Sequence, residues 1–373
     1  MASTTATWRV TSSTTALNIA VIGGGINGIM TAWHLAESGH QVQVFERGQV
    51  MAATSAASTK LLHGGLRYLE NREFRLVREG LRERAWWLAQ APHLAHPLQL
   101  LLPVHTWSRR PAWMLRIGLG LYGLLAGGWS LGPSQWHDRN AILRLQPQLS
   151  GTDLRGGFTF WDGQMADRAL GLWAVDQVRA KGVLIHEHRR VDRVDNNGVL
   201  TVDGQRLQFD RLINVAGPWA KELLDASGVS SHHSLDLIRG SHLILARPCN
   251  FGVLAEIPGE RRIAFILPWQ GRTLVGTTEE RQALADPIAI SQGEIAYLLA
   301  FHNRLMAQTA GPTDIAGTFA GLRPLLRSAD DPGRASREYA LERQGRLITV
   351  FGGKWTTSRA LGERVGRLAE LAE

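Results

Sequence analysis

The sequence predicts an α/β fold with two domains, one assembled from segments far apart in the chain and one built on an antiparallel sheet. Apolar strands that end in glycines or other small residues occur near residues 17, 212 and 347, and the first of them runs into a helix. Between the last two, residues 241–246, 262–268 and 272–276 alternate or run apolar, as strands of an antiparallel sheet do.

The composition is that of a globular protein. The 373 residues are 44% hydrophobic and 20% charged, which excludes a disordered or collagen-like chain. Lys and Arg (41) outnumber Asp and Glu (33), and the net charge of +8 favours an acidic partner: nucleic acid, an anionic membrane or a small anion. The single cysteine, Cys249, excludes an intramolecular disulfide and a cysteine-based zinc site, and no other spacing indicates a metal site.

The first predicted element is a complete β-α-β unit. Residues 17–22 form an apolar strand, residues 23–28 (GGGING) a turn, residues 29–38 a helix and residues 41–45 a second strand. A strand before the glycine turn and a helix after it make a Rossmann-type dinucleotide-binding domain the strongest prediction from the sequence.

The three spaced glycines of this turn have separate mechanical roles. Gly23 permits the tight turn, Gly25 lets the backbone approach a pyrophosphate, and Gly28 lets the helix pack on the strand. The helix N-terminus then presents free N–H groups to the phosphates. Glu46, at the end of the second strand, is placed to accept hydrogen bonds from an adenosine ribose.

A loop rich in small and hydroxyl side chains decides which dinucleotide is expected. Residues 54–68 (TSAASTKLLHGGLRY) can bond a pyrophosphate and a ribityl chain along their length, which suits an extended FAD better than NAD. A plain NAD domain would instead continue into further β-α-β units.

Two segments after this loop indicate whether the protein binds nucleic acid or a membrane. Residues 73–90 predict an arginine-rich helix, but glutamates interleave with the arginines, which favours local ion pairs and argues against nucleic acid. The apolar run 117–129 carries five glycines and is shorter than the ~20 residues of a membrane-spanning helix. We expect a core helix within a mostly helical insertion over residues 92–148, with membrane-surface contact as the alternative.

The remaining elements complete the two domains. Residues 165–181 predict a helix, residues 183–209 strands with a hairpin turn at 196–198, and residues 292–307 another helix. Residues 347–351 predict a final buried strand, followed by a Gly-Gly-Lys turn and a last helix from residue 356.

Taken together, the sequence resembles the FAD-dependent glycerol-3-phosphate dehydrogenases, within the D-amino-acid-oxidase-like flavoproteins. The resemblance covers about residues 17 to 366 in the family's order, and the blocks HGGLRYLE and GGK-x-TT are specific for it. Other matching stretches are NVAGPW at 214–219, GSH at 240–242, GTT at 276–278 and GLRPL at 321–325. The family reads Gly-Thr-Thr-Asp where this chain has Glu279, and it usually continues into a C-terminal helical domain, whereas this chain ends near the last predicted helix.

The resemblance implies oxidation of sn-glycerol 3-phosphate to dihydroxyacetone phosphate by hydride transfer to FAD N5, with electrons passed to a quinone or another acceptor. It also implies a cytoplasmic protein, with peripheral contact to the inner face of the membrane as a further expectation. The alternatives are a related FAD enzyme acting on another 2-hydroxy acid or amino acid, and a flavoprotein that has lost turnover.

The resemblance carries over to particular residues. For the substrate these are Arg67, Tyr68 and Arg337 at the phosphate, and Thr278, Arg323 and Lys354 nearer the reacting carbon. Arg323 and Lys354 are the expected catalytic residues, with His63 and His242 as candidate bases, because imidazole titrates near neutral pH. The expected cofactor residues are Gly23, Gly25, Ile26, Asn27, Gly28, Glu46, Arg47, Thr54, Ser55, Ser58, Lys60, Leu62, His63, Gly64, Val191, Ala216, Gly217, Trp219, Gly353, Lys354, Trp355 and Thr356.

These predictions divide the chain as follows. Residues 1–16 form a disordered leader, and residues 17–92, 160–230 and 313–373 form the α/β, Rossmann-type FAD-binding domain. Residues 93–159 and 231–312 form the antiparallel-sheet substrate or cap domain.

Overall fold

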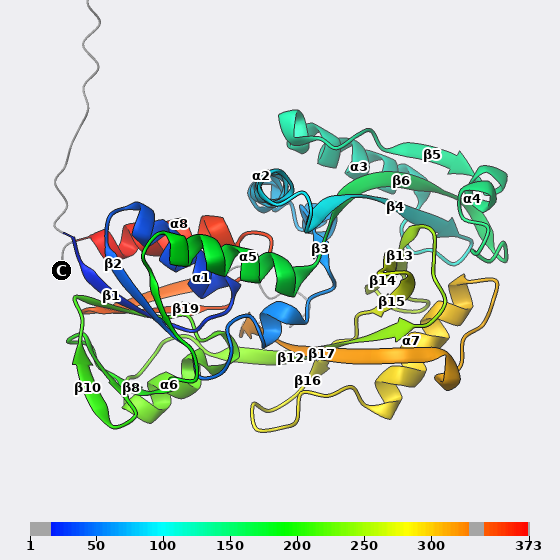
Figure 1. The fold of residues 1–373 in the computed structure, drawn as a ribbon. Helices are drawn as coiled ribbons and strands as arrows, with labels where there is room; N and C mark the ends of the chain where they lie inside the picture. The colour runs from blue at the N-terminus through cyan, green and yellow to red at the C-terminus, as the bar shows by residue number, and fades with distance from the viewer. Residues whose placement is uncertain (1–15, 328–338, 372–373) are drawn as a thin grey trace, which may run out of the picture.

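Two large β-sheets, a smaller one of six strands and a larger one of ten, and a separate sheet of three strands organise the computed structural model of the protein, which describes residues 16–327 and 339–371 (Figure 1). The predicted leader therefore lies outside the described residues, apart from Ala16. In the smaller sheet five strands run parallel and only β18 is antiparallel to its neighbour. Its strands are, in spatial order, β18 (Ala340–Gln344), β19 (Leu347–Phe351), β11 (Arg211–Asn214), β1 (Asn18–Ile22), β2 (Gln41–Phe45) and β7 (Leu184–His186).

Three helices pack together along this sheet: α1 (Ile26–Glu37), α5 (Asp167–Ala180) and α8 (Ser358–Glu370) (Figure 1). They share one hydrophobic core with the buried strands. Helices α1 and α8 approach closely at Gly362, where a Cβ would lie 2.5 Å from the carbonyl oxygen of Met30. A second core lies among α6 (Ala220–Ser227) and the antiparallel strands β8 (Val191–Val194), β9 (Val199–Val202) and β10 (Gln205–Gln208).

The larger sheet is antiparallel except where β13 runs parallel to β4. Its strands are β16 (Glu280–Arg281), β12 (Leu235–Leu245), β15 (Arg272–Gly276), β14 (Ile263–Trp269), β13 (Gly252–Glu256), β4 (Ala95–His105), β6 (Leu154–Met165) and β3 (Leu61–Leu62), with β17 (Ile315–Leu326) paired to β12 and β5 (Gln135–Asp138) to β6. Its helices are α2 (Phe74–Gln90), α3 (Ala112–Ala126), α4 (Arg139–Leu145) and α7 (Gln292–Leu305). Short 3-10 turns are η1 (Thr54–Ala56), η2 (Leu66–Leu69), η3 (Gly127–Trp129), η4 (Gly217–Trp219) and η5 (Pro312–Asp314).

The structure places two segments differently from the sequence-based expectation. Strand β17 pairs along its length with β12, from Leu326 opposite Leu235 to Ile315 opposite Leu245, so residues 315–326 belong to the larger sheet and not to the smaller one. Gly321 and Pro324, which are residue types common in turns, both lie within this strand. Likewise the expected helical insertion contains β4, an 11-residue strand that tolerates two prolines.

The apolar run that was expected to be a core helix is buried on one side only. Helix α3 buries Leu119, Tyr122 and Ala126 but exposes Trp113, Ile117 and Leu124 by 64%, 63% and 77%. Across residues 16–327 and 339–371, no helix is both long enough and apolar enough to cross a membrane.

Candidate active site

A cavity of about 410 Å³ lies where the carboxyl ends of β1 and β11 meet the larger sheet. It is lined by the glycine turn after β1, the end of β2, the hydroxyl-rich loop, the turn after β11, the middle of β17 and the turn after β19. Ligands in open parallel sheets bind at the carboxyl ends of the strands, so the cavity lies where this architecture predicts a ligand.

The glycine turn is built for close backbone approach. Gly23 adopts a φ of +116°, and a Cβ there would lie 2.5 Å from the carbonyl oxygen of Val215, the residue that follows β11. A Cβ on Gly28 would lie 1.9 Å from the oxygen of Gly23, so any side chain would push α1 away from β1. Gly28 does not line the cavity itself; its role is this packing.

Glu46 holds the same turn in place. Its carboxylate accepts hydrogen bonds from the backbone N–H groups of Gly24, at 2.7 Å, and Gly48, at 2.9 Å. Because a carboxylate has about four acceptor sites, these bonds leave capacity for a ribose hydroxyl, and Glu46 lines the cavity.

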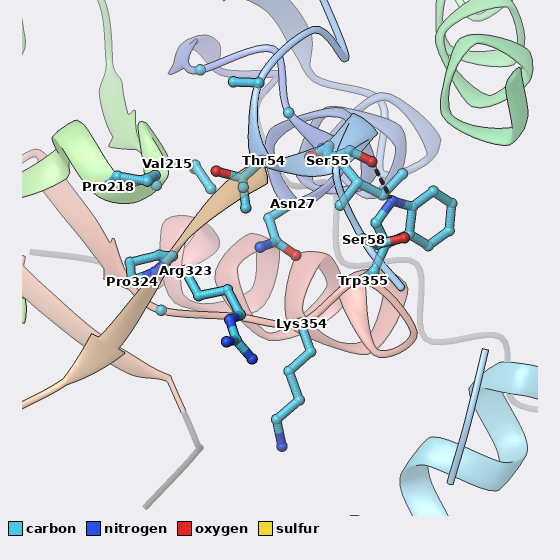
Figure 2. Close-up of a pocket in the computed structure, with 18 of the residues that line it drawn as sticks. Asn27, Thr54, Ser55, Ser58, Val215, Pro218, Arg323, Pro324, Lys354 and Trp355 are labelled. Atoms are coloured by element: carbon cyan, nitrogen blue, oxygen red, sulfur yellow. Dashed lines mark hydrogen bonds between the residues drawn. The ribbon is translucent and has the colours of Figure 1, made fainter. Parts of the chain in front are cut away.

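The hydroxyl-rich loop uses its side chains to join other parts of the chain. Ser55 accepts the N–H of Ile26 at 3.0 Å, and its carbonyl accepts the indole N–H of Trp355 at 3.0 Å (Figure 2). Thr54 donates to the carbonyl of Leu322 at 2.8 Å. The loop thereby connects the N-terminal turn, β17 and the turn after β19 into one wall of the cavity.

Lys60 and Leu62 do not line the cavity, contrary to the expectation that both contact the cofactor. The ammonium of Lys60 is buried and lies 2.8 Å from both carboxylate oxygens of Asp167, which also accepts the hydroxyl of Ser58. Burial lowers the pKa of Lys60, although Asp167 opposes that shift. Leu62 is fully buried in the hydrophobic core. Residue type alone could not distinguish a lysine that binds a phosphate from one that pairs inside the protein.

Arg323 and Lys354 extend toward the same end of the cavity (Figure 2). Arg323 lies on β17, donates to the carbonyl oxygen of Thr278 at 3.0 Å and lies 3.6 Å from Glu279. Lys354 follows β19, and its ammonium sits 4.1 Å from the ring centroid of Tyr68 in a cation–π contact. The structure thus brings together three of the residues expected at the substrate.

The other predicted substrate residues are placed differently. The side chain of Thr278 is 2% exposed and does not line the cavity; its hydroxyl donates to Glu294 at 2.6 Å. Its neighbour Thr277 lines the cavity instead. Arg67 is not among the lining residues, and Arg337 lies outside the described residues.

The two histidines differ in environment. His242 is 2% exposed, stacks on Phe319 at 4.5 Å, and its Nε2 lies 3.1 Å from the hydroxyl of Thr59. Burial, with lesser contributions from the nearby charges of Lys60 and Arg323, lowers its pKa from 6.5 to about 3, so the ring is neutral at physiological pH. His63 also lines the cavity, and its backbone N–H reaches the hydroxyl of Thr356 at 3.3 Å.

At the other end of the cavity the guanidinium of Arg47 stacks on the indole of Trp219 at 3.6 Å. Both residues line the cavity, together with the expected Val191, Ala216 and Gly217. Other lining residues were not predicted. Pro218, Thr277 and Thr357 lie within the family motifs, whereas no sequence signal stands out for Leu76, Arg190, Phe265 and Tyr339.

The lining fits a dinucleotide. Asn27 points into the cavity from the first turn of α1, and its buried Oδ1 accepts no hydrogen bond from residues 16–327 or 339–371 (Figure 2). Gly353 approaches the same side chain so closely that a Cβ would lie 2.5 Å from Asn27 Nδ2. A buried acceptor without a protein partner is costly, which indicates that a bound group supplies the donor.

Comparison with known proteins agrees with this geometry. The FAD dependent oxidoreductase family matches residues 18–368. The chain is 37% identical to the glycerol-3-phosphate dehydrogenase of Pseudomonas tolaasii, covering 95% of this chain and 71% of that protein. It is 36% identical to the aerobic glycerol-3-phosphate dehydrogenase of Escherichia coli K12 (93% and 72%) and 34% identical to the D-erythritol 1-phosphate dehydrogenase of Brucella abortus (92% and 72%).

Solved structures share the fold. The glycerol-3-phosphate dehydrogenase of Bacillus halodurans complexed with FAD superposes with a TM-score of 0.76 at 24% identity, covering 96% of this chain and 65% of that one. The glycine oxidase of Geobacillus kaustophilus gives a TM-score of 0.73 at 22% identity, with 95% of both chains covered. The family match extends over nearly the whole chain, and the lining of the cavity suits a dinucleotide. The chain therefore belongs to the FAD-dependent oxidoreductases, and its cofactor is FAD.

Proposed function

We propose that the protein oxidises sn-glycerol 3-phosphate to dihydroxyacetone phosphate. The observation that carries this proposal is the convergence of Arg323 and Lys354 on one end of the cavity, where two cations attract an anionic substrate (Figure 2). Relatives that match more than 90% of this chain are named for two polyol phosphates, glycerol 3-phosphate and D-erythritol 1-phosphate, which supports that substrate class.

Bound FAD supplies the acceptor for the hydride that leaves the alcohol carbon. The chain's own residues then have to hold that carbon close to the flavin and remove the hydroxyl proton. The carbonyl of Thr278 orients the guanidinium of Arg323, and the ring of Tyr68 supports the ammonium of Lys354. Both cations would also stabilise negative charge that develops at this end of the site. Arg67 and Arg337 remain proposed ligands of the substrate phosphate.

We assign the role of base to His63 and not to His242. A general base works best when its pKa lies near the operating pH. A pKa of about 3 makes His242 a poor proton acceptor, and its Nε2 is already engaged with Thr59. His63 lines the cavity in the loop that also carries Gly64.

We further propose that electrons pass to a quinone or another acceptor and that the protein contacts a membrane peripherally. The exposed face of α3, with Trp113, Ile117 and Leu124, supports this because large apolar side chains on a surface helix favour the membrane interface. Arg116 is exposed on the same helix and suits an anionic lipid surface.

One anaerobic spectrum tests the reaction. Glycerol 3-phosphate is expected to bleach the flavin band of the purified protein. Bleaching by a 2-hydroxy acid or an amino acid, but not by glycerol 3-phosphate, would favour the alternative substrate class. No bleaching by any of them, with FAD bound, would indicate a protein without turnover.

Paired arginine variants test the site. Arg323→Ala should keep FAD but slow flavin reduction by about 10²–10³-fold, as losing one charge-stabilising group does. Arg327→Ala, four residues further along the chain and exposed beside Asp236, serves as the control and should leave the rate unchanged. Loss of FAD from the Arg323 variant would show that Arg323 binds cofactor and not substrate.

A further inference from the structure

The inner face of α3 reaches the loop that lines the cavity. The hydroxyl oxygen of Tyr122 lies 2.8 Å from the backbone nitrogen of Gly64 and 2.8 Å from the carboxylate of Asp162. Tyr122 is 4% exposed, and both contacts are buried. A tyrosine from a surface helix therefore contacts the backbone beside His63, although its side chain does not line the cavity.

The neighbours of Tyr122 fix the direction of its hydrogen bonds. Asp162 pairs with Arg84, whose guanidinium is buried and donates to the Asp162 carboxylate at 2.9 Å, so this carboxylate acts as a hydrogen-bond acceptor. The hydroxyl proton of Tyr122 must point to Asp162, and its oxygen is left to accept the N–H of Gly64. Burial and the charge of Asp162 raise the pKa of Tyr122, which keeps the hydroxyl protonated.

Close packing leaves the loop little room around this bond. A Cβ on Gly64 would lie 2.6 Å from Leu81, and a Cβ on Gly80 would lie 3.0 Å from the Cα of Gly64. Helix α2 therefore limits the loop from one side while Tyr122 holds its N–H from another. Immediately after it, Gly65 turns in the left-handed region, with a φ of +80°, and its carbonyl accepts the N–H of Tyr68.

We propose that Tyr122 is a positioning residue whose hydroxyl sets the backbone at His63 and Gly64 against the flavin and, through the Gly65 turn, the place of Tyr68 under Lys354. The buried chain from Arg84 through Asp162 to Tyr122 fixes this arrangement in one orientation. The effect on Tyr68 rests on the proposed function, whereas the effect on bound flavin does not.

The test compares two tyrosine variants. Tyr122→Phe removes the acceptor for Gly64 with almost no change in shape. Tyr297→Phe, the control, removes a hydroxyl with a similar pair of partners: it donates to the carboxylate of Glu260 at 2.8 Å and accepts from Arg262 at 3.1 Å, and Tyr297 does not line the cavity. The FAD dissociation constant, the visible absorption and circular dichroism of bound flavin, and the KM for glycerol 3-phosphate are measured for both.

Tyr122→Phe is expected to weaken FAD binding about tenfold and to alter the flavin circular dichroism, because the unpaired N–H lets the loop shift. Tyr297→Phe should change neither. If both variants lose similar thermal stability while the flavin signals stay at wild-type values, Tyr122 is merely structural and the proposal is wrong.

A measurement on the wild-type holoprotein covers the case in which Tyr122→Phe does not fold. Hydrogen–deuterium exchange should show the Gly64 amide protected, and free exchange in the folded protein would overturn the proposal. An unchanged KM for glycerol 3-phosphate alongside altered flavin signals would overturn only the link to Tyr68. Because the flavin readouts need no substrate, a failure of the proposed reaction would not be mistaken for a failure of this inference.

Discussion

The carboxylate of Glu294, at the start of α7, is the centre of a buried network behind Arg323, and replacing it with glutamine should weaken the fold in a pH-dependent way. One oxygen accepts the hydroxyls of Ser241 and Thr278, at 2.7 and 2.6 Å. The other accepts from Arg239 and from the backbone of Ser291, both at 2.8 Å. An amide offers one acceptor atom, so Glu294→Gln leaves at least two of these donors facing an NH₂ group.

The pKa of Glu294 gives the size of the effect. Burial raises this pKa, but the hydrogen bonds from Thr278, Ser241 and the other donors outweigh it and lower the value from 4.5 to about 2. A shift of that size corresponds to roughly 3 kcal/mol of folding free energy contributed by the charged carboxylate. For a chain of 373 residues that unfolds as one unit, this is a loss of about 4 °C in Tm at pH 7.

The sign of the pH dependence follows from the direction of the shift. Because the folded pKa lies below the unfolded one, the stabilisation is fully present above about pH 4.5 and is lost as the pH falls towards 2. The free-energy difference between wild type and Glu294→Gln should therefore be constant from pH 7 to 5 and about 1 kcal/mol smaller at pH 4.

Thermal unfolding at saturating FAD measures this difference. Glu363→Gln, which breaks an exposed ion pair with Arg367, is the control and should cost less than about 1 kcal/mol at any of these pH values. A Glu294→Gln protein as stable as wild type at pH 7, or a deficit that stays the same at pH 4, would refute the reasoning.

Three further variants test other parts of the structure. Gly28→Ala places a Cβ 1.9 Å from a backbone oxygen of the glycine turn, and titration with FAD should show that binding is lost. The pKa of His242 is lowered to about 3 in the folded protein, so between pH 6.5 and 4 only the unfolded chain binds a proton at this residue, and stability falls as the pH falls. In His242→Asn this contribution is lost, and the slope of unfolding free energy against pH, measured by urea unfolding, should decrease by the equivalent of about one proton. Lys60→Met leaves the buried carboxylate of Asp167 without its lysine partner and should lower the free energy of unfolding by about 3–5 kcal/mol in the same assay. Lys221→Met, which breaks a surface ion pair with Asp225, is the control and should lower it by less than about 1 kcal/mol.

The parts of the fold that could be predicted are those encoded by residues close in sequence. In the glycine turn the backbone leaves no room for a Cβ at Gly23 or Gly28, so both positions require glycine. The sequence shows this requirement as the spacing of its glycines. Arg323 and Lys354 were found from short motifs and lie at the same end of the cavity. The pairing of β17 was not predicted for the opposite reason: its partner β12 lies about 80 residues earlier, and pairing at that distance leaves no local signal in the sequence.

The direction in which a side chain points was the second feature that could not be predicted from the sequence. Successive residues tend to point to opposite sides of an extended chain, so a motif that names Thr277 and Thr278 does not say which one faces the ligand. The structure turns Thr278 toward Glu294, an acid that lies 16 residues later on a helix. Tyr122 was hidden for a similar reason: it stands in an apolar run, where only the tertiary structure shows that its hydroxyl meets Gly64.

The hydroxyl-rich loop shows that residue type predicts which residues line the cavity better than it predicts which of them bond the cofactor. Thr54, Ser55 and Ser58 are predicted from the sequence to bond the cofactor, and all three line the cavity. Yet each hydroxyl also bonds the protein: Thr54 bonds Leu322, Ser55 bonds Ile26 and Ser58 bonds Asp167. A hydroxyl has one proton and two lone pairs, so these bonds reduce what it can offer a phosphate. The loop's composition is therefore explained first by its hydrogen bonds to three distant segments of the chain, on β17, α1 and α5.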